Sequence, residues 1–232
     1  MKAIVLAGDK NYLTPMLTTI KSILYYNQQV KIYILHQNIP SDWFHEVKIQ
    51  VERLGSLVED IFIGDVIDPE WKTQAHISPI AYARYLIPRL ITEDRVVYLD
   101  SDIIVHGDLS PLFDLDLGDY SLAAVRDVDG NGFNSGMLVI DCQKWREKDI
   151  SSLLFDKTVE YMSYLEQTTT EGFNGDQTIF NLVFQSHWLE LDKHFNLQVG
   201  HDVIAFYSHW DSHFELDKEP LIIHYTTHQK PW

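Results

Sequence analysis

The stretch RVVYLDSDIIV, residues 95–105, decides the fold that we expect for this chain. Its apolar run is of the kind found in buried strands of parallel sheets, and it leads directly into Asp100 and Asp102. Side chains alternate along an extended strand, so both carboxylates should point the same way while Ser101 points away. Ligands of open α/β sheets bind beyond the carboxyl ends of the strands. We therefore expect a ligand site at Asp100 and Asp102.

A carboxylate pair at this place predicts a divalent cation. Two unscreened carboxylates repel a phosphate, whereas Mg²⁺ or Mn²⁺ between them holds it, which implies a nucleoside diphosphate as the ligand. Two further Asp-x-Asp triplets occur, at 114–116 and 127–129, so the pattern gains its meaning only from its context. Residues 114–116 lie in an acidic segment, which is typical of a solvated surface.

The composition predicts a globular α/β protein. A chain of 232 residues with 45% hydrophobic residues can bury a substantial core, as one domain or as one domain with a small appendage. The 18 basic and 34 acidic residues give a formal charge of −16. Such a charge repels nucleic acid and anionic membrane surfaces, so a phosphate ligand has to bring or find a cation.

The sequence also bears on the cellular compartment. Cys142 is the only cysteine, which excludes an internal disulfide and fits a reducing compartment. Asp9 and Lys10 break the apolar start of the chain too early for a signal peptide, and no run approaches the roughly 20 residues of a membrane span. We expect a cytoplasmic protein without integral membrane association.

Strand-like and helix-like segments alternate along the chain, which predicts a mainly parallel sheet flanked by helices. Apolar runs predict strands at residues 3–6, 30–35, 57–63, 96–99, 121–125, 137–140 and 221–223. Helices are predicted from Thr14-Pro15 onward, at 41–54, from Ser78 to just before Pro88, at 150–165, and from Asp176 onward. The glycine-containing stretch 127–136 is predicted to be a turn, and no linker argues for two independent domains.

Several common motifs are absent from the sequence. The first predicted strand is not followed by G-x-G-x-x-G, and there is no G-x-x-x-x-G-K-[ST]. Glycine loops that cradle phosphates are therefore not expected. The chain also has no cysteine pair, no His-Glu-x-x-His and no G-x-S-x-G, so zinc sites and hydrolase nucleophiles of these kinds are not supported.

Six segments run nearly from one end of the chain to the other: LAGDKNY (6–12), ISPIAYARYLI (77–87), VVYLDSDIIV (96–105), FNSGMLVIDCQKW (133–145), GDQTIFN (175–181) and HYTTHQKPW (224–232). Together they resemble glycosyltransferase family 8, the group that includes glycogenin and bacterial lipopolysaccharide galactosyltransferases. The resemblance implies a Rossmann-like GT-A fold. It also implies one catalytic domain over 1–232, with a nucleotide-binding half at about 1–105 and a sugar and acceptor half at about 106–232.

The resemblance implies a reaction as well. The donor would be a UDP-sugar, usually UDP-glucose or UDP-galactose, with Mn²⁺ or Mg²⁺ as cofactor. The hexose would pass to a hydroxyl of a glycan or glycoprotein acceptor with retention of anomeric configuration.

The family pattern also implies roles for particular residues. Its metal ligands match Asp100, Asp102 and His224. Its positions for UDP-sugar binding match Ala7, Asp9, Asn11, Tyr12, Arg84, Ser101, Asp127, Asn134, Ser135, Asp176, Gln177, Thr227 and Lys230. Its catalytic positions match Gln177, Asp176, Arg84 and Lys230.

These residue types suit their implied tasks. An aromatic face such as that of Tyr12 can stack on uracil, and a fixed cation such as Arg84 stabilises a departing diphosphate. Structural alternatives stay open at this stage: a core aromatic for Tyr12, a histidine at the end of a buried strand for His224, a turn residue for Asn134, a helix N-cap for Asp176, and surface ion pairs for Arg84 and Lys230.

Gln177 matches the family position that faces the anomeric carbon. A neutral amide is a poor nucleophile compared with a carboxylate. We therefore favour same-face attack, in which the acceptor hydroxyl enters beside the departing UDP and a phosphate oxygen takes its proton.

The sequence departs from the family pattern in two places. Thr227 stands where a glycine usually contacts the diphosphate, which puts the placement of Lys230 in question. The span between Asp127 and Phe133 is shorter than in the galactosyltransferases, so the acceptor is the least defined part of the inference. A longer polypeptide with additional domains, or a homodimer, is compatible with the sequence.

Two alternative functions remain. A sugar nucleotidyltransferase shares the α/β layout and an LAG opening, but it needs further glycines and an arginine where this chain has Asp9, Lys10 and Asn11. A non-catalytic module that binds nucleotide sugars or carbohydrates could keep most of the same residues.

Overall fold

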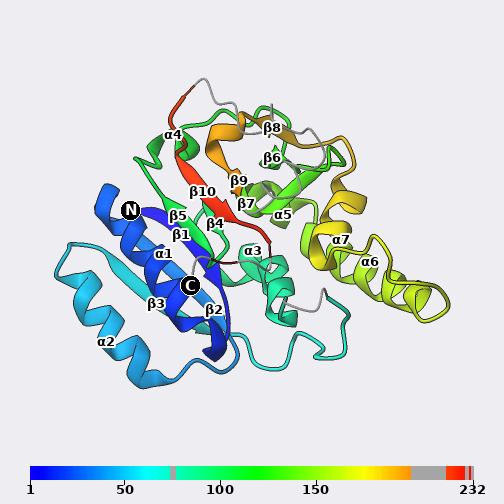
Figure 1. The fold of residues 1–232 in the computed structure, drawn as a ribbon, viewed down its shortest axis with the longest axis horizontal. Coiled ribbons are helices and arrows are strands. Elements are labelled where there is room, and N and C mark those ends of the chain that lie inside the picture. The colour runs from blue at the N-terminus through cyan, green and yellow to red at the C-terminus, as the bar shows by residue number, and fades with distance from the viewer. Residues whose placement is uncertain (74–76, 200–217, 228–229, 231–232) are drawn as a thin grey trace.

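The computed structural model describes residues 1–73, 77–199, 218–227 and 230 (Figure 1). The last residues of the C-terminal HYTTHQKPW segment, 228–229 and 231–232, lie outside this range. In chain order the elements are β1 (Lys2–Ala7), the 3-10 turn η1 (Lys10–Tyr12), α1 (Leu13–Tyr26), β2 (Val30–His36), α2 (Ser41–Glu52), β3 (Leu57–Phe62), the 3-10 helix η2 (Pro79–Leu86), α3 (Ile87–Leu90), β4 (Arg95–Leu99), β5 (Ile103–Val105), α4 (Ser110–Phe113), β6 (Leu122–Arg126), β7 (Phe133–Asp141), α5 (Cys142–Glu147), α6 (Ile150–Leu165), α7 (Gly175–Phe184), β8 (Leu189–Leu191), η3 (Lys193–Phe195), β9 (Leu197–Val199) and β10 (Ile222–Tyr225).

Seven strands form one mixed sheet in the order β3-β2-β1-β4-β7-β6-β8. Strands β1 to β4 run parallel to one another, β7 is antiparallel to both of its neighbours, and β8 is parallel to β6. The mainly parallel α/β sheet expected from the sequence is therefore confirmed. The carboxyl ends of β1, β4 and β6 and the amino end of β7 meet at the same edge, which places Ala7, Asp100, Asp127 and Asn134 there.

The sheet is buried on both faces, which explains its continuous apolar strands. In β1, Ala3 and Val5 pack into one core cluster with the tyrosines of η2, whereas Ile4 and Leu6 pack into a second cluster with α1 and α2. The period-two alternation of a strand divides consecutive apolar residues between two faces in this way. Helices therefore cover both sides of the sheet that carries the expected ligand site.

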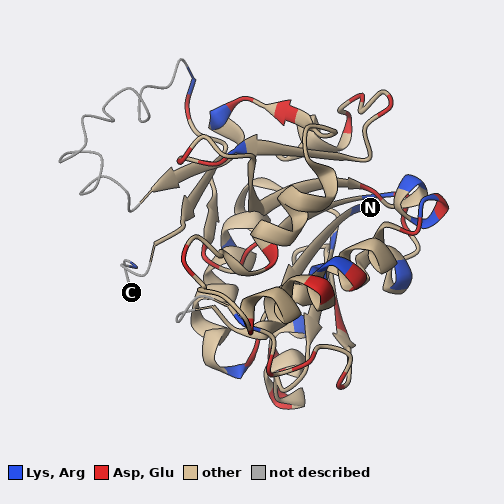
Figure 2. Cartoon of the chain, turned by 90° about the vertical axis from the view of Figure 1, so that its right-hand side faces the viewer, with Lys and Arg blue, Asp and Glu red and all other residues tan. Residues whose placement is uncertain are grey.

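Acidic residues recur over many surface loops and helices, in keeping with the formal charge of −16 (Figure 2). Basic residues lie among them, and several form surface ion pairs such as Arg126 with Glu190. Within the described residues, no helix is long and apolar enough to cross a lipid bilayer.

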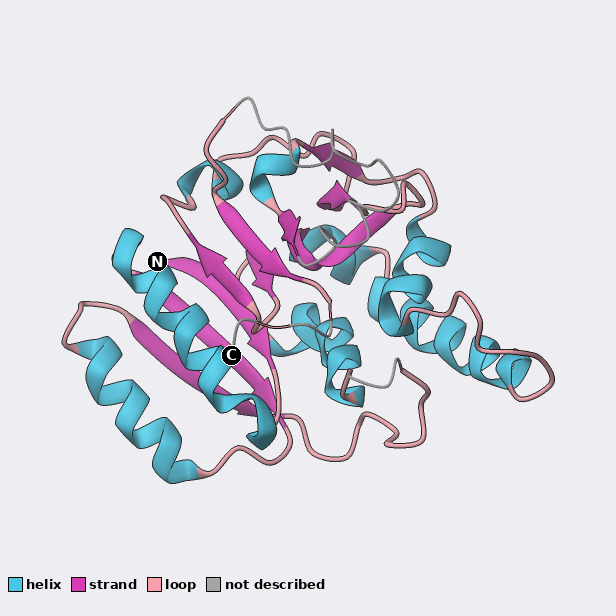
Figure 3. Ribbon diagram, in the orientation of Figure 1, coloured by secondary structure: helices cyan, strands magenta, loops and turns pink. Residues whose placement is uncertain are grey.

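A second, three-stranded sheet has the order β5-β10-β9 (Figure 3). Its strand β10 pairs antiparallel with β5, so that His224 lies opposite Ile103, and parallel with β9, so that His224 lies opposite Gln198. Of its three strands, only β10 was expected from the sequence. This small sheet carries His224 to the chain segment that follows β4.

Several predicted element boundaries are wrong. Helix α1 begins at Leu13 rather than after Thr14, and Pro15 lies in its first turn, where a missing N–H breaks no helical bond. For the same reason Pro88 does not end the helical segment but lies in the first turn of α3. Leu54, expected on the apolar face of α2, lies beyond the helix and is exposed.

Candidate functional site

A cavity of about 680 Å³ opens at the sheet edge where β1, β4, β6 and β7 meet. All the residues singled out from the family pattern line it: Ala7, Asp9, Asn11, Tyr12, Arg84, Asp100, Ser101, Asp102, Asp127, Asn134, Ser135, Asp176, Gln177, His224, Thr227 and Lys230. The sequence analysis did not single out the other lining residues as site residues: Gly8, Ile77, Ser78, Ile80, Ala81, Tyr98, Val128, Gly136, Asn174 and Thr226. The fold thus gathers distant segments into one site, while their individual roles stay predictions.

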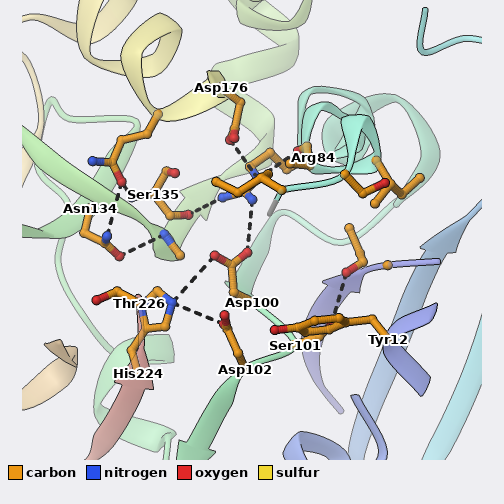
Figure 4. A pocket seen from close by; sticks show the side chains of 18 of the residues that line it. Tyr12, Arg84, Asp100, Ser101, Asp102, Asn134, Ser135, Asp176, His224 and Thr226 are labelled. Atoms are coloured by element: carbon orange, nitrogen blue, oxygen red, sulfur yellow. Dashed lines mark hydrogen bonds and ion pairs between the residues drawn. The ribbon is translucent and has the colours of Figure 1, made fainter. Parts of the chain in front are cut away.

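Asp100, Asp102 and His224 form an acidic centre in which one ligand atom from each residue lies within 4.8 Å of the others (Figure 4). His224 Nε2 is 3.3 Å from Asp102 Oδ1 and 3.8 Å from Asp100 Oδ2. The alternation argument for this convergence was wrong, because the chain leaves β4 at Leu99 and turns at Ser101 and Asp102 before β5. The turn itself brings the carboxylates together.

The chemistry of the acidic centre fits a divalent cation. Asp102 Oδ1 is buried and accepts no hydrogen bond from the described residues. Burial alone would raise the pKa of Asp102, but His224 and Lys230 beside it hold that pKa below its usual value. Two carboxylates and an imidazole are a donor set that Mn²⁺ or Mg²⁺ accepts, with imidazole better suited to Mn²⁺. The centre could therefore hold either metal.

Lys230 already brings one positive charge to the acidic centre. Its Nζ lies 2.6 Å from Asp102 Oδ2 and also donates to the backbone carbonyl of Tyr225. The surface-pair alternative is thus partly correct, since an ion pair forms, but the pair is half-buried and lines the cavity.

Arg84 is buried between two carboxylates, which rules out a surface ion pair. Its Nη2 is 3.0 Å from Asp100 Oδ1, its Nε is 3.1 Å from Asp176 Oδ2, and its guanidinium lies over the ring of Tyr98. Nη1 donates to the carbonyl of Ser135 at 2.5 Å. Burial would lower the pKa of Arg84, but Asp100 and Asp176 raise it, so the side chain stays charged.

The sequence suggested that Asp176 could cap helix α7, but it does not. The N-cap is Asn174, and Asp176 is the second residue of the helix, in its first turn, where it is buried and faces Arg84. Burial raises the pKa of Asp176 to about 6, against the opposing effect of Arg84. This carboxylate therefore positions Arg84 from the first turn of α7.

Amide side chains form the opposite wall of the cavity. Asn134 Nδ2 donates to Gln177 Oε1 at 3.2 Å and to Asp127 Oδ1 at 3.3 Å, and the backbone N–H of Ser135 donates to Gln177 Oε1 at 3.1 Å. Residues 134–136 were expected in a turn but belong to strand β7, and only 127–132 form the loop.

Gly136 has a packing role that the sequence analysis missed. A Cβ atom there would lie 2.1 Å from His224 Cε1 and 2.7 Å from Asp100 Oδ2. A glycine within a strand often marks such a close approach of another group to the backbone. The acidic centre therefore packs directly against the β7 backbone.

Asp127 lies where the loop leaves β6. Burial and the neighbouring carboxylate of Asp129 raise the pKa of Asp127 to about 6. An acid in this state can exchange between hydrogen-bond donor and acceptor near neutral pH.

The loop after β1 forms the remaining side of the cavity. The Asp9 side chain accepts from the N–H of Asn11 at 2.8 Å and thereby starts η1. Tyr12 is half-buried beside the acidic centre, where burial first and then Asp102 and Asp100 raise its pKa. Ser101 Oγ donates to the Ala7 carbonyl at 3.1 Å, which ties this loop to the turn after β4.

Known proteins share this fold and these segments. Glycosyltransferase GlyD of Streptococcus pneumoniae is 49% identical over the whole chain, which covers 28% of that relative. The crystal structure of GlyE from the same species superposes with a TM-score of 0.83 at 36% identity, over 100% of this chain and 57% of GlyE. The structure of the galactosyltransferase LgtC with donor and acceptor sugar analogs superposes with a TM-score of 0.82 at 25% identity, over 99% of this chain and 89% of LgtC.

These neighbours confirm the GT-A class of α/β fold expected from the sequence. Residues 3–232 match the family described as Glycosyl transferase family 8. The chain belongs to this family, although it spans only about a quarter to just over half of the length of the S. pneumoniae relatives.

Proposed function

We propose that this chain is a retaining glycosyltransferase that moves glucose or galactose from a UDP-sugar to a hydroxyl of a glycan or glycoprotein, with Mn²⁺ or Mg²⁺. The observation that carries the proposal is the acidic centre of Asp100, Asp102 and His224, which lines a cavity large enough for a nucleotide sugar. The relative LgtC, named a galactosyltransferase and crystallised with donor and acceptor sugar analogs, supports the donor class.

The charged residues would bind the diphosphate and neutralise its charge. Asp100, Asp102 and His224 would hold the metal, which when bound supplies positive charge against the phosphate oxygens. Arg84, fixed in place by Asp176, and Lys230 add further positive charge on the same side of the cavity. Fixed positive charges stabilise the leaving UDP as its negative charge develops.

The geometry of Gln177 supports same-face attack. Its Oε1 already accepts hydrogen bonds from Asn134 Nδ2 and the Ser135 N–H, so the carbonyl oxygen is engaged by protein donors. The side chain therefore offers an amide N–H to the sugar rather than a nucleophilic oxygen. In the proposed step the acceptor oxygen bonds to the anomeric carbon, the bond to UDP breaks on the same face, and a phosphate oxygen takes the hydroxyl proton.

The loop after β1 would bind the nucleoside. Ala7, Asp9, Asn11 and Tyr12 lie together at one end of the cavity, with backbone groups and an aromatic ring available to a uracil base. We also propose one catalytic domain over residues 1–232, because the seven-stranded sheet takes strands from both halves of the chain. The glycan or glycoprotein acceptor and a cytoplasmic location belong to the same proposal.

A donor panel tests this function. UDP release would be measured for UDP-glucose, UDP-galactose and UDP-N-acetylhexosamines, with Mn²⁺ and with EDTA, followed by an acceptor screen and analysis of the product anomer. We expect metal-dependent UDP release from a UDP-hexose. Pyrophosphate formed from UTP and a sugar 1-phosphate, without UDP release, would indicate a nucleotidyltransferase. Tight UDP-sugar binding without hydrolysis or transfer would indicate a binding module.

A further inference from the structure

We infer that Asn196, which does not line the cavity, is a positioning residue that sets the tautomer of His224 for cation binding. The inference rests on the proposed function, because it assumes that His224 is a metal ligand. Asn196 directly precedes β9. Both residues are buried, with Asn196 1% exposed and His224 3% exposed. Solvent therefore cannot readily replace the hydrogen bond between them.

The orientation of Asn196 follows from a fixed backbone donor. The N–H of Gly136 donates to Asn134 Oδ1 at 3.1 Å, so this atom is the amide oxygen of Asn134. Asn196 has to present its Nδ2 to the same oxygen, at 3.0 Å. Its Oδ1 then faces His224 Nδ1 at 3.1 Å, and because an amide oxygen only accepts, Nδ1 carries the proton.

A second backbone donor fixes the same network from its other end. The N–H of Ser135 donates to Gln177 Oε1, which identifies that atom as the oxygen. The atom of Asn134 that lies 3.2 Å away is then its Nδ2 donor. Flipping either Asn134 or Asn196 would place two donors or two acceptors against each other, at a cost of the order of one to three kcal/mol for each unsatisfied buried group. The network therefore admits one arrangement.

This arrangement prepares His224 for a metal. With the proton on Nδ1, the neutral ring has a free lone pair on Nε2, which points toward Asp102 Oδ1 and Asp100 Oδ2. Nε2 and Asp102 Oδ1 are then two acceptors 3.3 Å apart, a contact that needs a proton or a cation between them. A metal-bound histidine commonly donates its other N–H to a carbonyl or carboxylate oxygen in this way. Asn196 supplies that oxygen.

The test measures Mn²⁺ affinity directly, in the presence of UDP, from the electron paramagnetic resonance signal of free Mn²⁺. We expect Asn196→Ala to weaken Mn²⁺ binding by about 10- to 100-fold. Asn196→Asp keeps an acceptor opposite Nδ1 but sets its second oxygen against Asn134 Oδ1. It should therefore lower the melting temperature and still bind Mn²⁺ more tightly than Asn196→Ala. Equal weakness of the two variants would overturn the inference.

Asn27→Ala is the matched control. Asn27 is an equally buried asparagine, at 2% exposure, with three hydrogen bonds to the backbone of Ile23, Gly107 and Leu109, far from the acidic centre. Its loss should lower the melting temperature but leave Mn²⁺ affinity within about twofold of the wild type. A comparable loss of Mn²⁺ affinity in Asn27→Ala would mean that the effect is general destabilisation, and would refute the role of Asn196.

His224→Ala separates the two proposals. If His224→Ala loses Mn²⁺ affinity while Asn196→Ala keeps it, the tautomer inference fails and the metal site stands. If His224→Ala binds Mn²⁺ as tightly as the wild type, the metal site of the proposed function fails, and the inference fails with it.

Discussion

The two walls of the cavity differ in how their polar groups are satisfied. The amide wall, made of Asn134, Ser135 and Gln177, is tied together and to Asn196 outside the cavity by hydrogen bonds that begin at backbone N–H groups. The acidic centre keeps a buried carboxylate oxygen without a hydrogen bond. The hydrogen-bonding groups of one wall satisfy one another, whereas the other wall keeps an oxygen that can accept a cation, so substitutions in the two walls should produce different kinds of defect.

Removing a charge from the acidic centre should have the largest effect. In Asp102→Asn we expect Mn²⁺-dependent UDP release to fall roughly 10³-fold, because a metal contributes several kcal/mol to stabilising the charge of the leaving group. The amide has the same shape, so the fold should stay intact, although loss of the ion pair with Lys230 should lower the melting temperature. Turnover over a Mn²⁺ titration and a thermal melt measure both.

Asp114→Asn is the matched control for this variant. Asp114 begins another Asp-x-Asp triplet but is exposed on the surface. It should retain wild-type turnover. Unchanged activity in Asp102→Asn would refute the assignment of the metal site.

Arg84 joins the two walls, and its loss should be the next largest effect. Arg84→Met leaves Asp100 and Asp176 without their shared partner, and removing one member of a buried ion pair costs about 3 kcal/mol or more. Urea unfolding measures the loss. Arg89→Met is the control, because Arg89 and Asp149 form an exposed pair, whose contribution to stability should be far smaller. Equal losses in the two variants would contradict the buried role of Arg84.

The smallest expected effect concerns pH at the edge of the amide wall. Because the pKa of Asp127 is raised to about 6 in the folded protein, folding favours its protonated form. Stability should therefore fall as pH rises from about 4 to about 6, and Asp127→Asn should remove about 1 to 2 kcal/mol of that fall. Urea unfolding at several pH values tests this. A constant difference between variant and wild type across the range would count against the raised pKa.

The sequence could predict features that are local. A buried strand followed by acidic residues is visible in residues 95–105, and its position at a sheet edge follows from general α/β topology. Arg84 could be named from the family pattern, but its burial between Asp100 and Asp176 could not, because those carboxylates come from separate elements. Contacts of this kind are set by the tertiary structure.

Asn196 shows most clearly what the sequence could not reveal. It belongs to no matched segment, and its contact with His224 depends on the pairing of β9 with β10. The stretch 134–136 illustrates a related error, because its asparagine and glycine are typical of turns. It lies instead within strand β7, between the residues that pair with β6 at Phe133 and with β4 from Met137 onward. In both places long-range pairing decides the outcome.

The contact between Gly136 and His224 has a mechanical consequence. The carbonyl of Gly136 accepts from the N–H of Asp100 at 2.8 Å, so the same residue spaces the imidazole on one side and anchors a carboxylate on the other. A methyl group at position 136 would push the imidazole of His224 away from strand β7. The dimensions of the acidic centre are thus governed by the backbone of β7.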